Sequence, residues 1–338
     1  MDVKRLRTRL FRANEFWVFL VIIVLAVIIQ ARSGQFFTAN NLVDIANAMV
    51  VPGIFAVGAH LVIVSGGIDV SFPALASLAV YATTRLLVDM GYDGPVVIPF
   101  LMAIAFGAVL GAFNGIFTSR LTVPTLIITL GTANVFSGVM QGALNSVQIP
   151  NIPSSMSAFG SASLFEVTNP SSGLRSTMPL SFLLFVAVVA AAWFLTRRTM
   201  FGRGIFAIGG DAASAERAGF KVQRIRFWLY VVVGVIAAIA GLVRTCSMGQ
   251  MHPTNLLGME MMVIAAVVLG GTAITGGTGS LTGVILGTAL IVIVQNSMIL
   301  TGISTFWQGF ALGLLIIVGT GISAMQVARS RGLRITAA

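Results

Sequence analysis

Long apolar runs separated by short polar connections are the feature that most constrains this 338-residue chain. Hydrophobic residues make up 57% of it and charged residues only 9%, which excludes an ordinary soluble globular domain. A helix needs about 20 apolar residues to cross a bilayer, and lipid offers no partners to backbone polar groups. The sequence therefore predicts an all-α polytopic membrane protein, with residues 1–338 forming a single transmembrane domain.

Ten runs are long enough to be spans, and short connections join most of them. The expected spans are Phe16–Gln30, Val43–Val64, Phe72–Val88, Val96–Thr118, Pro124–Gln141, Pro179–Thr196, Phe227–Val243, Met259–Ala273, Leu281–Leu300 and Phe306–Met325. The basic segment from Lys4 to Arg12 places the N-terminus in the cytoplasm, and an even number of spans returns the C-terminus there. This topology leaves all but four of the 20 Lys and Arg residues on the cytoplasmic side. The net charge of +10 is thus an orientation signal, and nucleic acid is not expected as a partner, because the basic residues lack interleaved aromatic residues.

A polar loop at residues 197–226 is the only strongly charged segment between two apolar runs. It carries seven Lys and Arg residues against two acids and faces the cytoplasm in this topology. Asp211 is suited to cap a helix, residues 212–218 have high helix propensity, and Gly219 is a natural stop. We therefore expect a short exposed helix, which is a docking device. The longest external connection, residues 142–178, is rich in Ser, Asn and Pro and is expected to be an extracytoplasmic loop with turns.

Two glycine-rich breaks interrupt the apolar runs, at residues 65–71 and 270–280. In the first break, paired glycines free the backbone, Asp69 is suited to cap the next helix, and Pro73 suits its first turn. A carboxylate near membrane depth is costly and favours a functional role, although a tight capped turn explains these residues equally well. The candidate gating or turn residues are Gly66, Gly67, Asp69, Ser71, Gly276 and Gly277.

Several neutral polar residues lie inside the expected spans. Lipid cannot satisfy them, so some must face a cavity or bond across helices, and they suit an uncharged polyhydroxy solute better than an ion. The candidate substrate-pathway residues are Asn114, Thr132, Asn134 and Asn296. For any one of them, bonding between helices is an equally good explanation. Small residues at helical spacing, Gly107/Gly111/Gly115 and Gly277/Gly279/Gly283/Gly287, are expected to let helices approach closely.

Several chemistries are excluded by what the sequence contains. Its two lysines, Lys4 and Lys221, do not follow the glycine pattern of a Walker A loop, so ATP must be brought by another subunit if ATP drives the protein. Two histidines, one cysteine and few acids make a metal site improbable, and no cofactor is expected. No nucleophile-elbow pattern accompanies the Ser, His and Asp residues, so we do not expect an enzyme.

Four segments carry a family resemblance when taken together in order. They are residues 65–71, 123–132, the loop 201–225 with Gly210 and Ala218-Gly219, and 268–283. With these segments the chain resembles, from about residue 42 to 325, the membrane-spanning permease of bacterial ABC importers for simple sugars, the ribose-type permeases. The resemblance implies a multi-pass protein of the bacterial inner membrane that pairs with a second permease subunit. It also implies two cytoplasmic ATPase subunits docked on the 197–226 loop, and an extracytoplasmic sugar-binding protein that delivers the substrate.

By this resemblance the short helix is a coupling helix, which ATP-driven closure of the ATPases would push. Its candidate coupling residues are Asp211, Ala215, Glu216, Arg217, Ala218 and Gly219. The near alternative is a branched-chain amino-acid or nucleoside ABC permease, and Gly66-Gly67-Ile68-Asp69 resembles the sugar branch more. An ion-coupled secondary transporter is a further alternative, but charged residues are nearly absent from the span centres. The resemblance leaves the solute itself open, because specificity in such systems rests largely with the binding protein.

Overall fold

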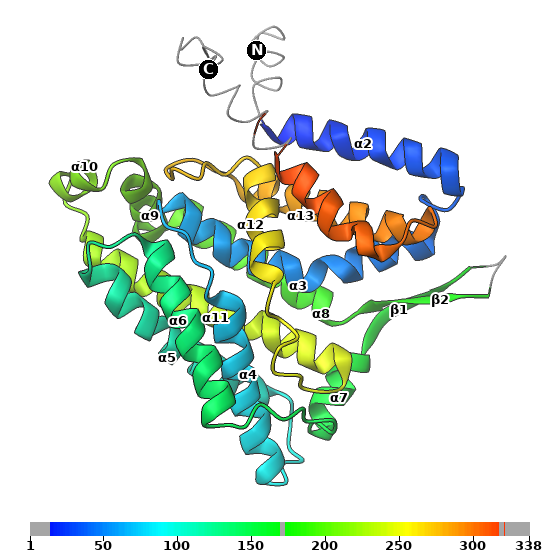
Figure 1. Ribbon diagram of the computed structural model, residues 1–338, viewed down its shortest axis with the longest axis horizontal. Helices are drawn as coiled ribbons and strands as arrows, with labels where there is room; N and C mark the ends of the chain where they lie inside the picture. Colours follow the sequence, from blue (N-terminus) through cyan, green and yellow to red (C-terminus); the bar gives the residue numbers. More distant parts are fainter. Residues whose placement is uncertain (1–13, 170–172, 318–320, 322–338) are drawn as a thin grey trace, which may run out of the picture.

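The computed structural model describes residues 14–169, 173–317 and 321, and most of these residues are helical (Figure 1). The longer helices are α2 (Asn14–Ser33), α3 (Ala39–Val64), α4 (Phe72–Asp89), α5 (Val97–Arg120), α6 (Thr125–Gly142), α8 (Ser181–Arg198), α11 (Val222–Met248) and α13 (Leu281–Leu300). The shorter elements are α7 (Ser154–Ser161), β1 (Ser163–Thr168), β2 (Arg175–Pro179), α9 (Met200–Gly210), α10 (Ala212–Arg217), α12 (Met259–Leu269) and the 3₁₀ helix η1 (Thr305–Trp307).

Helices occupy the positions of the expected spans. Within the described residues, six are long and apolar enough to cross a membrane: α2, α3, α5, α8, α11 and α13. Helices α4 and α6 also lie at expected spans but fall outside this set of six. Helix α12 has only 11 residues, and the apolar helix at Thr305–Ile317 covers the described part of the last expected span. The basic residues Lys4 to Arg12 and those of the C-terminal tail lie outside the described residues.

The described chain is mostly helical, in agreement with the predicted class, and it adds one small β-hairpin that the prediction did not include. The loop 142–178 contains α7, and its strand β1 pairs with β2 in an antiparallel hairpin. The side-chain amide of Asn40, at the start of α3, donates hydrogen bonds to the carbonyl oxygen of Val167 (3.0 Å) and to Ser176 Oγ (3.2 Å). The turn residues of this loop were recognised in the sequence, but the short strands between them were not, because the exposed residues of β1 show no alternation with buried ones.

Helices α3 and α11 form the centre of the bundle. Close approach of α11 to α5 is permitted by Gly107, Gly111 and Gly115, where a Cβ atom would crowd backbone carbonyl oxygens of α11. In the same way Gly283 and Gly287 on α13 lie against the backbone of Gly270 and Ala266. The predicted close helix contacts are therefore confirmed at these five glycines, whereas Gly277 and Gly279 precede α13 and lie in the loop.

The polar loop 197–226 is mostly helical, which the sequence reading did not anticipate beyond α10. Helix α8 extends to Arg198, α9 follows at once, and α11 begins at Val222 rather than at Phe227. The side chain of Thr199 caps α9 by accepting a hydrogen bond from the backbone N–H of Gly202 (3.0 Å). Helix α9 was not predicted because it contains four glycines, and glycine is a poor helix former.

Candidate functional site

Helix α10 has the local structure that the sequence predicted. The carboxylate of Asp211 accepts a hydrogen bond from the backbone N–H of Ser214 and so caps the helix. This backbone hydrogen bond lowers the pKa of the Asp211 carboxyl below its ordinary value of 3.8. The helix ends at Arg217, and Gly219 follows with φ +91°, a conformation that favours glycine. The predicted cap, helix and stop are confirmed as local structure.

The candidate coupling residues divide into one anchor and an exposed surface. Ala215 is buried, with 4% of its surface exposed. Asp211, Glu216, Arg217, Ala218 and Gly219 are all exposed. The helix is therefore seated by one small side chain and presents its charged residues outward, at the end of the molecule beside α9 (Figure 1).

Three glycine pairs meet where α3 ends, and we call residues 66–67, 209–210 and 276–277 the glycine junction. The backbone N–H of Gly277 donates to the carbonyl oxygen of Val64 (2.8 Å). A Cβ atom on Gly209 would overlap that carbonyl oxygen, and one on Gly276 would lie 2.7 Å from the Cα of Gly66. Side chains are excluded at Gly209, Gly276 and Gly277, so at these positions the three backbones lie directly against one another.

Left-handed backbone conformations add to this requirement for glycine. Gly66, Gly276 and Gly277 have φ angles of +82°, +88° and +76°. The junction brings the two predicted glycine breaks together and joins both to α9, which leads directly into α10. Gly209 was missed as a candidate, although its pairing with Gly210 is a signal of the same kind as the two pairs that were recognised.

A buried polar network follows the first glycine pair. The carboxylate of Asp69 accepts hydrogen bonds from the backbone N–H (2.7 Å) and the hydroxyl (2.6 Å) of Ser71, and the Asn114 amide donates to Ser71 Oγ (2.7 Å). Asp69, Ser71 and Asn114 are each buried. The expectation that Asp69 caps α4 through that helix's own N–H groups was wrong, because its carboxylate instead holds Ser71, the residue before the helix. The predicted place of Pro73 in the first turn is confirmed.

A second anchor holds the glycine loop 270–280 against α3. His60 Nδ1 lies 2.9 Å from Thr272 Oγ1, and both side chains are buried. A Cβ atom on Gly279 would lie 2.8 Å from the His60 ring. Within the described ranges no group of three or more His, Cys, Asp or Glu side chains is placed to hold a metal ion.

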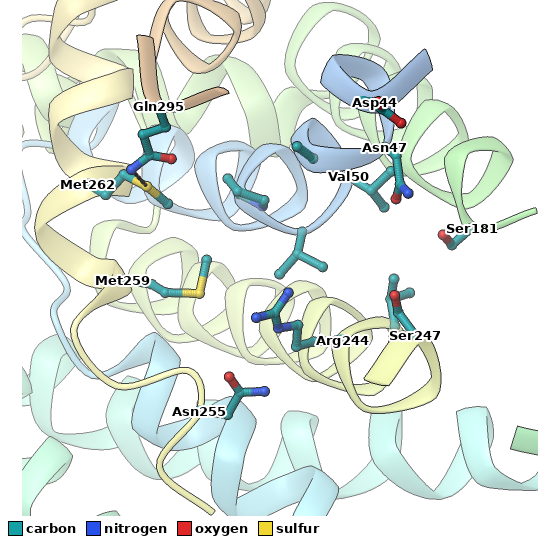
Figure 2. Close-up of a pocket in the computed structure, with 14 residues that line it drawn as sticks. Asp44, Asn47, Val50, Ser181, Arg244, Ser247, Asn255, Met259, Met262 and Gln295 are labelled. Carbon is teal, nitrogen blue, oxygen red and sulfur yellow. Dashed lines mark hydrogen bonds between the residues drawn. The ribbon is translucent and has the colours of Figure 1, made fainter. Parts of the chain in front are cut away.

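A cavity of about 560 Å³ lies beside the N-terminal half of α3, at the opposite end of this helix from the glycine junction (Figure 2). Its wall is formed by α3, the start of α8, α11, α12, α13 and the turn before α12. The polar residues that line it are Asp44, Asn47, Ser181, Arg244, Ser247, Asn255 and Gln295. Pro52 also lines it and has no N–H to donate to the carbonyl of Ala48, another lining residue. This volume lies in the range of small-molecule sites, about 300–1,000 Å³.

The four predicted pathway residues are not brought together. Asn114 belongs to the Asp69 network, and the buried Thr132 hydroxyl donates to Thr129 of its own helix (3.3 Å). Asn134 is exposed and bonds Leu130, one turn earlier. Asn296 lines a smaller cavity that shares Asp44, Ala48 and Gln295 with the larger one. The remaining lining residues, Arg244 above all, were missed, because sequence gives no sign of which polar residues point inward.

Comparison with known proteins places the chain in a family. The family described as Branched-chain amino acid transport system / permease component matches residues 41–319. The chain is 30% identical to the probable ABC transporter permease protein YphD of Escherichia coli, over 94% of this chain and 91% of that protein. It is 31% identical to the autoinducer 2 import system permease protein LsrC of Klebsiella pneumoniae, over 91% and 86% of the two chains. It is 30% identical to the ribose import permease protein RbsC of Escherichia coli, over 88% and 90%. No solved structure matches.

The chain therefore belongs to this family of membrane permease components. The predicted resemblance to ABC importer permeases is confirmed, and the protein is a transport subunit rather than an enzyme.

Proposed function

We propose that this chain is the membrane-spanning subunit of an ATP-driven importer that moves a simple sugar across the bacterial inner membrane. The observation that carries the mechanism is the glycine junction, which joins the exposed helix α10, through α9, to both glycine breaks. The sugar is supported by the similarity to the ribose import permease, which extends over 88% of this chain.

The length of α3 and its contacts at each end support the proposed orientation of the chain in the membrane. Its 26 residues correspond to about 39 Å of helix, more than the hydrocarbon core of about 30 Å. The β1–β2 hairpin contacts Asn40 at the start of α3, whereas α9 contacts Val64 at its end. This arrangement supports placing these two elements on opposite sides of the membrane. We place α9 and α10 in the cytoplasm, with ten spans and both termini cytoplasmic, because the loop 197–226 is basic.

In this mechanism two cytoplasmic ATPase subunits dock on the exposed residues of α10. Their closure on ATP displaces α10 and α9, and the junction passes the displacement to residues 66–71 and 276–277. Backbone-to-backbone contact suits this task, because no flexible side chain lies between the moving parts to absorb the displacement. A second permease subunit completes the membrane unit, and a sugar-binding protein delivers the solute on the side of the hairpin.

Uptake by cells that carry the complete importer tests this proposal. We expect the double substitution Glu216→Ala and Arg217→Ala to uncouple ATP hydrolysis from sugar uptake without reducing the amount of chain in the membrane. The matched control is Arg85→Ala with Asp89→Ala, an exposed acid–base pair whose side chains are 2.9 Å apart on α4. Normal coupling in the α10 variant, or equal loss in the control, would contradict the assigned role.

The family's description favours one alternative solute, a branched-chain amino acid. Competition experiments in the same cells separate the two, because excess leucine should leave the uptake of labelled ribose unchanged. ATP-independent transport by the purified chain under an ion gradient would instead support a secondary transporter.

A further inference from the structure

The cavity beside α3 contains polar side chains without intramolecular partners. Arg244 lies four residues before the end of α11, and its Nε atom is buried without a hydrogen-bond partner in the described structure. Its guanidinium forms no ion pair with Asp44 in the described part of the chain, and the two groups do not point toward each other (Figure 2). A charged group held in a membrane bundle is costly, so an unpaired arginine there is a functional signal.

Four of the other polar groups share this condition, whereas the side-chain amides of Asn255 and Gln295 donate to the sulfur atoms of Met248 and Met262. Asp44, Asn47, Ser181 and Ser247 line the cavity, and none has a side-chain hydrogen bond within the described residues. They come from three different helices and lie on more than one side of the space (Figure 2). Together with Arg244, these four groups leave hydrogen-bond donors and acceptors of the cavity wall unused.

The chemistry of these groups selects one class of solute. An arginine only donates hydrogen bonds and an ionised carboxylate only accepts them, whereas a hydroxyl does both. The single cation and single acid of the lining cancel in formal charge, so neither an anion nor a cation is favoured over a neutral molecule. Met259, Met262 and the valines of the wall offer apolar surface for C–H groups. An amino acid would need its two charges met at one end and an apolar remainder, which these dispersed polar groups do not provide.

We propose that this cavity is a solute-binding site within the permease chain itself and that Arg244 determines its specificity for a neutral, hydroxyl-rich solute such as an aldose. The proposal rests on the proposed function, which supplies the sugar that such a site would hold. It adds that the permease, and not the delivering protein alone, selects the solute.

Protection of a cavity thiol from labelling tests the site in the full-length chain. Ser247→Cys places a thiol on the cavity wall, and the wild-type chain, whose single Cys246 is buried, gives the blank. We expect D-ribose at high millimolar concentration to slow labelling of the Ser247→Cys variant by a water-soluble maleimide several-fold. Ser163→Cys, on the exposed strand β1, should be labelled equally with and without ribose.

The role of Arg244 is tested by adding Arg244→Gln to the Ser247→Cys variant. Ribose protection should be lost, whereas Arg175→Gln, on the hairpin away from the cavity lining, should leave it intact. Protection that survives Arg244→Gln would overturn the assignment. Stronger protection by L-leucine or by the sugar acid D-ribonate would overturn the solute class.

Uptake by cells carrying the wild-type importer separates this proposal from the proposed function. ATP-dependent ribose uptake without any protection at position 247 would refute the cavity site and leave the importer function standing. ATP-dependent leucine uptake without ribose uptake would refute the sugar function and the aldose site together.

Discussion

The two ends of α3 differ in what they place beside the helix. Near its start, residues 44–52 border a cavity in which several polar side chains, Asp44 and Asn47 among them, have no side-chain partner in the described residues. At its end, Val64 lies against the bare backbone of Gly209 and Gly277, with no room for a methyl group at Gly209. Ile54 to Ile63 lie between them, and the large side chains there are at most 2% exposed. We propose that one end holds a solute and the other transmits displacement, and a buried segment of the helix separates them.

The largest expected effect comes from adding one methyl group to the junction. Gly209→Ala would force the new Cβ into the Val64 carbonyl, and overpacking of this kind costs about 1–3 kcal/mol or more. We expect uptake to fall severalfold or more, because the added methyl group forces the 209–210 segment away from the carbonyl of Val64. The measurement is initial uptake rate per amount of chain in the membrane.

The neighbouring glycine supplies a matched control for this prediction. A Cβ atom on Gly210 would meet nothing within 4 Å, so Gly210→Ala should transport normally. Equal loss in both variants would show that glycine content near α10, and not close backbone contact at the junction, is what matters.

The buried network next to the junction should give the second largest effect. The Ser71 hydroxyl donates a hydrogen bond to the Asp69 carboxylate and accepts one from the Asn114 amide. Ser71→Ala removes this hydroxyl and leaves both buried groups without that partner. Such a loss costs about 1–3 kcal/mol, and we expect a lower unfolding temperature of the detergent-solubilised chain. Ser119→Ala is the control, because its exposed hydroxyl bonds only its own helix. An unchanged unfolding temperature for Ser71→Ala would argue against a structural role for this network.

The cavity end of α3 should tolerate a larger side chain without loss of stability, whereas the glycine junction should not. Ala48 is exposed and lines the cavity. Ala48→Leu should therefore change the free energy of unfolding by no more than a typical surface substitution, about ±0.5 kcal/mol, and leave the unfolding temperature nearly unchanged. Filling the space should nevertheless reduce uptake. A large loss of stability would show that the cavity closes in the folded protein, and the contrast with Gly209→Ala would disappear.

The same contrast explains which features the sequence could predict. Apolar runs and turn-forming residues act locally, so the helices, the α10 cap at Asp211 and the stop at Gly219 could be predicted. The junction joins segments that are more than 60 residues apart in the chain, and no local pattern says that Gly209 meets Val64 and Gly277. The cavity was missed for the same reason, because the direction of Arg244 depends on how α3 and α12 pack around α11.

The smallest expected effect concerns the helix cap at Asp211. Its carboxyl pKa is lowered in the folded protein by the hydrogen bond from Ser214, so the cap is present above the ordinary value of 3.8 and is lost as pH falls through the lower folded value. Coupling should therefore not depend on this group between about pH 5 and 8. Asp211→Asn keeps an acceptor and should retain coupling, whereas Asp211→Ala should weaken it modestly by fraying α10. The measurement is the ratio of solute imported to ATP hydrolysed in vesicles, and equal ratios for the Ala and Asn variants would show that the cap does not position the docking surface.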